Sequence, residues 1–326
     1  MKTIEMIKGA KKLVEECTRV KEGENVLIVT DMVTPLTIAE VLAIACKERG
    51  AEPTVVIMSP PTKEHEGDPP PPVAEAMMKS QVIFLACSES IFSSASRVRA
   101  TNAGARCFNF SGFAEEDLVR GAIEANFLET KDLVEKVASA LGKAKEAQVT
   151  TALGTDLYLD FRGRLERLLR FNALCHEPGD AKSINLEAAV SPTVGKARGT
   201  IVCDGSVTLF KPGLIQEPVR ATVRDGMITE IRGGREARNL ARLLASTGDP
   251  MVYNLSEFAI GLNPKAILTG VPPQDRGVYG TCHIGFGSNV NWGGKIKAAT
   301  HFDFVINAPK VELDGVTMLE DFRFHL

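Results

Sequence analysis

The chain has 326 residues, of which 44% are hydrophobic and 24% charged, and its formal net charge is −3. This balance excludes the strongly basic surface typical of nucleic-acid-binding proteins, and no apolar run reaches the roughly 18 residues of a membrane span. The start of the chain lacks the apolar segment of a signal peptide, and seven scattered cysteines without a CxxC pair indicate reduced thiols. We therefore expect a cytoplasmic globular protein of about two domains, with no nucleic-acid or membrane partner.

The first 147 residues alternate short apolar runs with helical patterns. Continuous β-branched runs predict buried strands, and periodic apolar residues predict helices between them. The expected strands are 25–31, 53–58, 81–87 and 106–110, and the expected helices include 34–50, 94–104 and 130–147. Six prolines among residues 59–72 predict a loop. This alternation predicts an α/β domain over 1–147 with a doubly wound parallel sheet.

From residue 148 onward the pattern changes to short β runs separated by turn residues. Asp-Gly pairs such as Asp225-Gly226 and Asp314-Gly315 stand between two such runs, which is the strongest local signal for a hairpin. One helix is expected at 235–248 among these strands. We predict an α+β, strand-rich and metal-binding second domain over 148–326.

Two polar segments follow predicted strands of the first domain. Neither the GxGxxG nor the GxxxxGK[ST] pattern is present, which gives no support to dinucleotide or P-loop chemistry. Asp31 and the segment 88–90 lie at carboxyl ends of strands, where ligands of open α/β sheets usually bind. Asp and Ser also cap helices and turns very often, and we favour this second interpretation.

Histidine is scarce and unevenly placed. Three of the five histidines and the single tryptophan lie in the last 44 residues. In the predicted strand 300–306, His301 and Asp303 are two residues apart and point to the same side. An imidazole and a carboxylate so placed form a two-point metal chelate, although for the pair taken alone we favour a His–Asp hydrogen bond at a strand end.

Three further residues carry the same chemistry in apolar strands. Glu257 and Glu187 stand among aliphatic and aromatic residues, where a charge is costly unless it is paired or bound to metal. His283 lies in a predicted strand bounded by glycines. With His301 and Asp303 they form a set of three carboxylates and two imidazoles, which suits zinc, manganese, cobalt or iron.

Several segments resemble a known family. NLSEFAIGLNP, GTCHIGFGSN, WGG and THFDFVI are similar, in that order, to the C-terminal motifs of the aminopeptidase T metallopeptidases, and GENVLIVTD and GTIVCDGSV also match. The same superfamily contains 2,5-dihydroxypyridine 5,6-dioxygenase, an iron enzyme that cleaves a ring. The resemblance covers most of the chain and implies a metal-dependent enzyme that forms a homo-oligomer.

The resemblance to aminopeptidase T assigns roles to individual residues. It implies that Glu187, Glu257, His283 and the His301–Asp303 pair are metal ligands. The family carries one more glutamate upstream of the histidine, where this chain has Val278 with only Asp275 nearby. One ligand is therefore missing, and the likeness does not extend to a full dinuclear site.

The dioxygenase pattern matches differently. Its His-His-Asp triad has a histidine where this chain has Glu257, and its HxD pair corresponds to His301 and Asp303. Its further histidine, in a Leu-His-Ser-Pro segment, aligns with Phe92-Ser93-Ser94 and is absent here. Recruitment of His283 would restore two histidines.

Three hypotheses follow. On ligand identity we place first a metallohydrolase with zinc, cobalt or manganese, whose metal-activated water attacks an amide or peptide carbonyl of a small molecule or short peptide. Glu187 would be its general base, and Tyr279, the second candidate catalytic residue, would line its pocket with the loop 289–294. A packing role explains Tyr279 and Trp292 equally well. The second is an Fe(II)-dependent dioxygenase of a hydroxylated pyridine. The third is a non-catalytic member of the superfamily.

Overall fold

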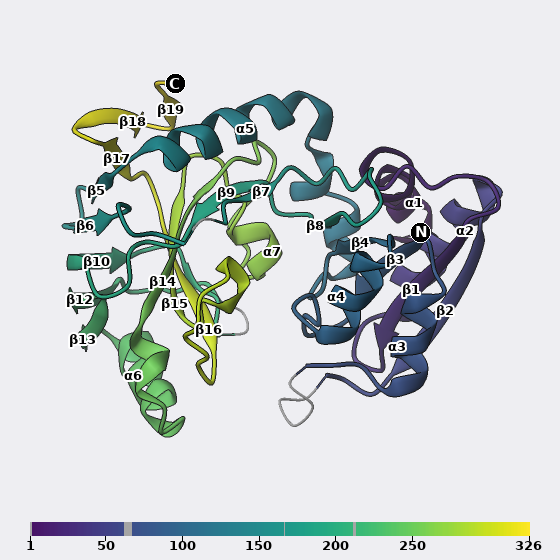
Figure 1. The fold of residues 1–326 in the computed structure, drawn as a ribbon, viewed down its shortest axis with the longest axis horizontal. Helices are drawn as coiled ribbons and strands as arrows, with labels where there is room; N and C mark the ends of the chain where they lie inside the picture. The colour runs from purple at the N-terminus through teal and green to yellow at the C-terminus, as the bar shows by residue number, and fades with distance from the viewer. Residues whose placement is uncertain (1, 62–66, 166, 211–212) are drawn as a thin grey trace. The chain divides into compact units, whose positions relative to one another are not determined.

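The computed structural model describes the chain except for residues 1, 62–66, 166 and 211–212 (Figure 1). It divides into two compact units, Met1–Glu129 with Phe171–Asn185, and Thr130–Arg170 with Leu186–Leu326. The expected domains, 1–147 and 148–326, differ from these units in two segments. The helix α5 (Phe127–Lys143) lies mainly in the second unit, and residues 171–185 return to the first. Amphipathic periodicity predicts a helix but does not say which neighbour covers its apolar face.

The first unit is built on a five-stranded parallel sheet with the order β2-β1-β3-β4-β8. From β1 the chain goes to β2 on one side and then crosses to β3 and β4 on the other. Since such connections are right-handed, this reversal places helices on both faces, which confirms the doubly wound prediction. The strands are β1 (Asn25–Asp31), β2 (Glu52–Met58), β3 (Val82–Ala86), β4 (Arg106–Asn109) and β8 (Ala181–Ser183).

The helices of this unit are short, and one begins inside the expected proline-rich loop. Pro71 opens α3 because the first turn of a helix needs no hydrogen bond from its backbone nitrogen. The helical segments are α1 (Lys2–Lys11), η1 (Lys12–Cys17), α2 (Leu36–Glu48), α3 (Pro71–Met78), α4 (Ala95–Asn102), η3 (Glu115–Leu118) and η4 (Ala122–Glu124). None of the helices in the described part of the chain is long and apolar enough to cross a membrane.

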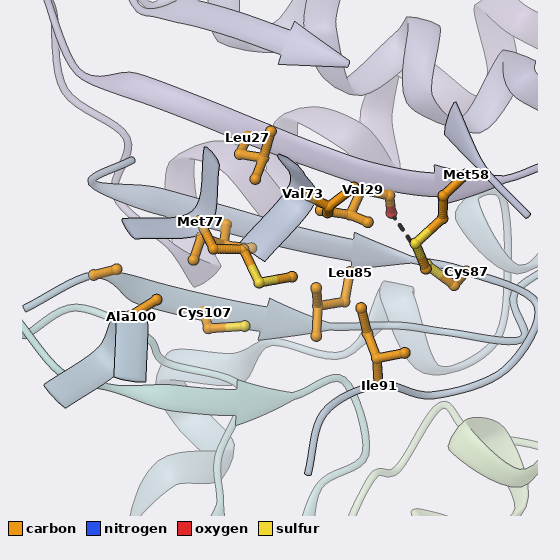
Figure 2. Packing of buried hydrophobic residues seen from close by; sticks show 12 residues of the cluster. Leu27, Val29, Met58, Val73, Met77, Leu85, Cys87, Ile91, Ala100 and Cys107 are labelled. Atoms are coloured by element: carbon orange, nitrogen blue, oxygen red, sulfur yellow. Dashed lines mark hydrogen bonds between the residues drawn. The ribbon is translucent and has the colours of Figure 1, made fainter. Parts of the chain in front are cut away.

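One hydrophobic cluster of the first unit lies between its sheet and the helices α3 and α4 (Figure 2). Leu85 of β3 and Met77 of α3 are fully buried there. The thiol of Cys87 lies 3.5 Å from the Val29 carbonyl oxygen, and burial raises its pKa to about 12. All seven cysteines of the chain are buried and free, so these thiols act as small apolar packing groups.

The second unit contains an eight-stranded sheet with the order β13-β12-β10-β6-β5-β17-β18-β19. Its two Asp-Gly turns confirm the expected hairpins, because Asp225, Gly226, Asp314 and Gly315 all have positive φ, as a type I′ turn requires. The strands are β5 (Glu146–Thr150), β6 (Asp156–Asp160), β10 (Arg198–Cys203), β12 (Val219–Arg224), β13 (Met227–Arg232), β17 (Lys310–Leu313), β18 (Val316–Glu320) and β19 (Arg323–Phe324).

A second, six-stranded sheet has the order β11-β16-β15-β14-β9-β7. Four aromatic residues of its central strands are fully buried: Phe258, Phe286, Phe302 and Phe304. Phe258 stacks on Phe161, which follows β6 of the larger sheet, at 6.2 Å between ring centroids. The strands are β7 (Leu169–Phe171), β9 (Glu187–Val190), β11 (Ser206–Val207), β14 (Leu255–Gly261), β15 (Cys282–Gly287) and β16 (His301–Ile306).

Short helices connect these strands, and one strand is irregular. The connecting helices are α6 (Arg235–Ser246), η5 (Pro250–Tyr253), α7 (Pro272–Asp275) and η6 (Val290–Trp292). Along β14 the register against β15 shifts between Leu255 and Glu257, which leaves Ser256 as the extra residue of a β-bulge. The bulge interrupts the alternation of side chains, so that Ser256 and Glu257 both reach the same histidine, as described below.

Candidate metal centre

The five predicted ligands come together in the six-stranded sheet. Glu187, Glu257 and His283 lie on the neighbouring strands β9, β14 and β15, and the His301–Asp303 pair lies on β16 next to β15. They form two groups, each with ligand atoms within 4.8 Å of one another, and Glu257 belongs to both. Strand pairing thus brings Glu187 and His283, which are 96 positions apart in the sequence, to within 3.5 Å of each other.

The spacing of the ligand atoms fits a metal ion. His301 Nε2 lies 3.1 Å from Glu257 Oε2 and 3.2 Å from Asp303 Oδ1. His283 Nε2 lies 3.5 Å from Glu257 Oε1 and 3.5 Å from Glu187 Oε2. Ligand atoms about 2.0–2.2 Å from one ion are themselves roughly 3–3.5 Å apart. The observed separations therefore fit atoms that share an ion.

Unsatisfied polar atoms support the same interpretation. Both ring nitrogens of His283 and the Oδ1 atom of Asp303 are buried and make no hydrogen bond among the described residues. Buried polar atoms normally have partners, since a lost hydrogen bond is costly in a low dielectric. Gly285 lies between Glu257 and Asp303 in the sheet register, and a Cβ there would come within 2.9 Å of Asp303 Oδ1. The missing side chain keeps open the space between the two carboxylates.

A second layer of contacts orients His301. Its Nδ1 lies 3.2 Å from the Ser288 carbonyl oxygen and 3.4 Å from the Ser256 hydroxyl oxygen. A carbonyl can only accept, so Nδ1 carries the proton and donates it, which turns Nε2 toward the carboxylates. The ring of Trp292 packs near the imidazole at 5.7 Å between centroids and is almost fully buried.

The carboxylates change the protonation of the cluster. Burial disfavours an imidazolium, but the charges of Asp303 and Glu257 outweigh it and raise the pKa of His301 to about 10. The pKa of His283 is raised too, because Glu257 and Glu187 together outweigh burial. Burial opposes ionisation of Asp303, yet Arg276 and His301 hold the pKa of this carboxyl well below its usual range. The carboxylates therefore favour the protonated form of both imidazoles when no ion is bound.

Sequence reasoning missed two residues beside Asp303. Arg276, directly after α7, reaches Asp303 Oδ2 with Nε at 2.6 Å and Nη2 at 2.5 Å. The Thr208 hydroxyl donates to the same oxygen at 3.2 Å and accepts from the backbone N–H of Asp303 at 2.8 Å. The only signal in the sequence is a single arginine in the stretch PPQDRGVYGTC, seven residues before His283.

Asp275 does not replace the missing family ligand. Its carboxylate accepts hydrogen bonds from the backbone N–H groups of Thr269 at 2.8 Å and Gly270 at 3.1 Å. Burial raises its pKa, partly opposed by these bonds. Asp275 therefore fixes the loop before α7, and it belongs to neither group of candidate ligands.

Tyr279 and the 289–294 loop differ in their relation to the cluster. The ring of Tyr279 packs edge-on against Phe324 at 5.2 Å, and none of the contacts described for it joins it to the five ligands. Trp292, within the loop, lies against His301. A catalytic role for Tyr279 stays a prediction.

Asp31 and Ser88 of the first unit are engaged in turns. Asp31 Oδ1 accepts from the backbone N–H groups of Val33 and Thr34, and Oδ2 accepts from the backbone N–H and hydroxyl of Ser88. Ser94 caps α4 by accepting from the Arg97 backbone N–H. These bonds confirm the interpretation of Asp31 and Ser88 as turn residues.

The family is decided by comparison with known proteins. Residues 5–325 match the model of a family described as 2,5-dihydroxypyridine 5,6-dioxygenase. The chain belongs to this dioxygenase family. Over 133 residues it is 32% identical to 2,5-dihydroxypyridine 5,6-dioxygenase of Pseudomonas putida, and this match spans only 38% of each chain.

Two solved structures share the fold of this dioxygenase-family chain. The 2,5-dihydroxypyridine dioxygenase from Pseudomonas putida KT2440 has a TM-score of 0.84 at 18% identity, covering 99% of this chain and 97% of that one. Wild-type AmpT from Thermus thermophilus has a TM-score of 0.71 at 15% identity and covers 99% of both chains. This chain therefore shares one fold with both the dioxygenase and AmpT.

Proposed function

We propose that the five-residue cluster binds a divalent transition-metal ion, and that the protein cleaves the ring of a hydroxylated nitrogen heteroaromatic with dioxygen. The observation that carries the metal site is the convergence of three buried carboxylates and two imidazoles at ligand spacing. Membership of the dioxygenase family supports the oxidative chemistry. Hydrolysis, the first of the sequence-based hypotheses, thereby becomes the second candidate.

The donor set is compatible with iron. Glu257 lies between the two imidazoles, with Oε1 facing His283 and Oε2 facing His301. Two histidines and one carboxylate are the ligands typical of non-haem Fe(II) oxygenases. In this chain the two imidazoles belong to different ligand groups that share Glu257, so Glu257, His301 and Asp303 would hold the ion, with His283 facing the other oxygen of Glu257. A bound Fe(II) ion would supply the redox chemistry toward dioxygen.

The residues of the chain itself supply orientation and proton transfer. The Ser288 carbonyl fixes the tautomer of His301, and the ring of Trp292 packs near the imidazole. We assign to Glu187, whose Oε2 faces His283, the role of accepting a proton from a substrate hydroxyl. A carboxylate in this buried site is effective as a base because little water competes for the proton.

A specific observation favours hydrolysis as the second candidate. The cluster contains three carboxylates, whereas the two-histidine iron site has only one. Glu257 also stands where the resembled dioxygenase pattern has a histidine. Oxygen-rich sites of this kind also suit manganese and zinc, which lower the pKa of a bound water and polarise a carbonyl group. On this alternative Glu187 serves as the general base toward water.

Metal analysis followed by two assays tests the proposal. The protein should be purified without chelator or metal-affinity resin, and its metal content measured. We expect a bound divalent ion, and oxygen uptake when Fe(II) and 2,5-dihydroxypyridine or a related dihydroxypyridine are supplied. Release of p-nitroaniline from leucine p-nitroanilide with zinc, cobalt or manganese, without oxygen uptake, would show that the protein is a hydrolase. A metal-binding protein inactive in both assays would overturn both and support a non-catalytic role.

A further inference from the structure

The two oxygens of the Asp303 carboxylate have different partners. All three side-chain donors that reach its Oδ2 come from Arg276 and Thr208, namely Nε at 2.6 Å, Nη2 at 2.5 Å and the Thr208 hydroxyl at 3.2 Å. Its Oδ1 instead faces His301 Nε2 at 3.2 Å and makes no hydrogen bond among the described residues. One oxygen is thus held by the protein and the other is presented to the cluster.

Arg276 also changes the charge of the cluster. The three carboxylates and this guanidinium carry a net charge of −2 when both imidazoles are neutral. One divalent ion neutralises that charge. Two ions would leave a net positive charge among side chains that are nearly all buried, where uncompensated charge is strongly unfavourable. The two overlapping ligand groups, taken without Arg276, offer a place for each of two ions.

We propose that Arg276 is a positioning residue that holds Asp303 through Oδ2, leaves Oδ1 alone to bind the ion, and limits the cluster to one divalent ion. The inference rests on the proposed metal site but not on the choice between oxidation and hydrolysis. Arg276 reaches the carboxylate from the turn after α7, and its side chain is 30% exposed whereas that of Asp303 is fully buried. The guanidinium therefore enters from the rim of the site and is not part of the packed core.

The geometry distinguishes this role from a simple ion pair. A purely structural pair would stabilise the fold without affecting how many ions bind or how they are coordinated. A guanidinium supplies two N–H donors in a fixed fork, and lysine supplies the same charge at a single point. Substitution by lysine therefore separates the charge of Arg276 from its geometry, and substitution by methionine removes both.

The experiment uses the full chain with Co²⁺ as the only probe. Wild type, Arg276→Met, Arg276→Lys and the matched control Arg232→Met are titrated by calorimetry, which gives the number of ions, and by absorption of the bound Co²⁺, which reports its coordination. Arg232 is an exposed arginine that pairs with Glu230. We expect one Co²⁺ per chain for wild type and control, a second equivalent for Arg276→Met, and one equivalent with an altered spectrum for Arg276→Lys.

The possible outcomes separate this inference from the proposed function. Absence of Co²⁺ binding by the wild-type protein overturns the proposed metal site itself. Two ions in the wild type, or an Arg276→Met protein with wild-type stoichiometry and spectrum, overturns only the role of Arg276. If circular dichroism shows that Arg276→Met does not fold, the Arg276→Lys protein tests the positioning role instead. A Co²⁺ spectrum of Arg276→Lys identical to that of the wild type would contradict that role.

Discussion

A buried acidic residue, Asp31, ends β1 in the first unit, and three others lie on the six-stranded sheet of the second, but they are satisfied in different ways. Asp31 receives backbone N–H groups and hydroxyls at both oxygens. The ligands in the second unit face one another, and His283 has no hydrogen bond among the described residues. A carboxylate saturated by the backbone stabilises a turn. A carboxylate whose neighbours are other ionisable groups is available to bind an ion.

The largest loss of metal affinity is expected from substitution of Glu257, which belongs to both ligand groups. Glu257→Gln removes its charge from both, and we expect the affinity for a divalent ion to fall at least about 100-fold. The measurement is a calorimetric titration with Mn²⁺ or Zn²⁺. Glu230→Gln, at an exposed glutamate of β13, is the matched control and should bind as wild type does. Unchanged affinity in the Glu257 variant would show that the cluster is not the site.

Asp31→Asn tests the turn that follows β1 in the first unit. The amide leaves donors at the former Oδ2 without an acceptor, so the free energy of unfolding should fall by about 2 kcal/mol while metal affinity stays the same. Burial opposes ionisation of Asp31, but bonds from Ser88, Thr34 and Val33 outweigh it and lower its pKa. The stabilisation is therefore present at neutral pH and is lost as the pH falls below about 4.

Urea unfolding at several pH values measures this difference. Wild type and Asp31→Asn should differ by a constant amount near neutral pH and converge in acid. A loss of metal binding in this variant would contradict the division between the two regions, because it would make the turn at Asp31 part of the site.

The smallest effect is expected for Ser256→Ala. Its hydroxyl lies 3.4 Å from His301 Nδ1, whereas the Ser288 carbonyl is closer at 3.2 Å and remains in the variant. Loss of so long a contact should weaken ion binding by no more than about threefold. The same titration measures it. A tenfold or larger loss would mean that the bulge residue, not the Ser288 carbonyl, sets the tautomer.

Much of the site could be predicted because its chemistry is local. Glu257 and Glu187 stand out as charges within apolar strands, and spacing alone places His301 and Asp303 on one side of a strand. The Asp-Gly turns likewise predict hairpins because few residues adopt positive φ in pairs. In each case a single segment contains both the pattern and its physical reason.

What was missed depends on contacts between distant segments. Thr208 meets Asp303 across 95 positions of sequence and Arg276 meets it across 27, and neither stands in a regular pattern. The bulge at Ser256 breaks the alternation on which strand predictions rest. The return of residues 171–185 to the first unit depends on β8, three residues long, pairing with β4. So short a strand has no periodicity to detect.

That return has a consequence for how the protein can be made and divided. The chain passes between the units after residues 129, 170 and 185, so neither unit is one continuous piece of the gene. During synthesis the first unit cannot complete its sheet until β8 has emerged, well after α5 and the first strands of the second unit. A fragment that ends at residue 129 would leave β4 as an open sheet edge, prone to pairing with other chains.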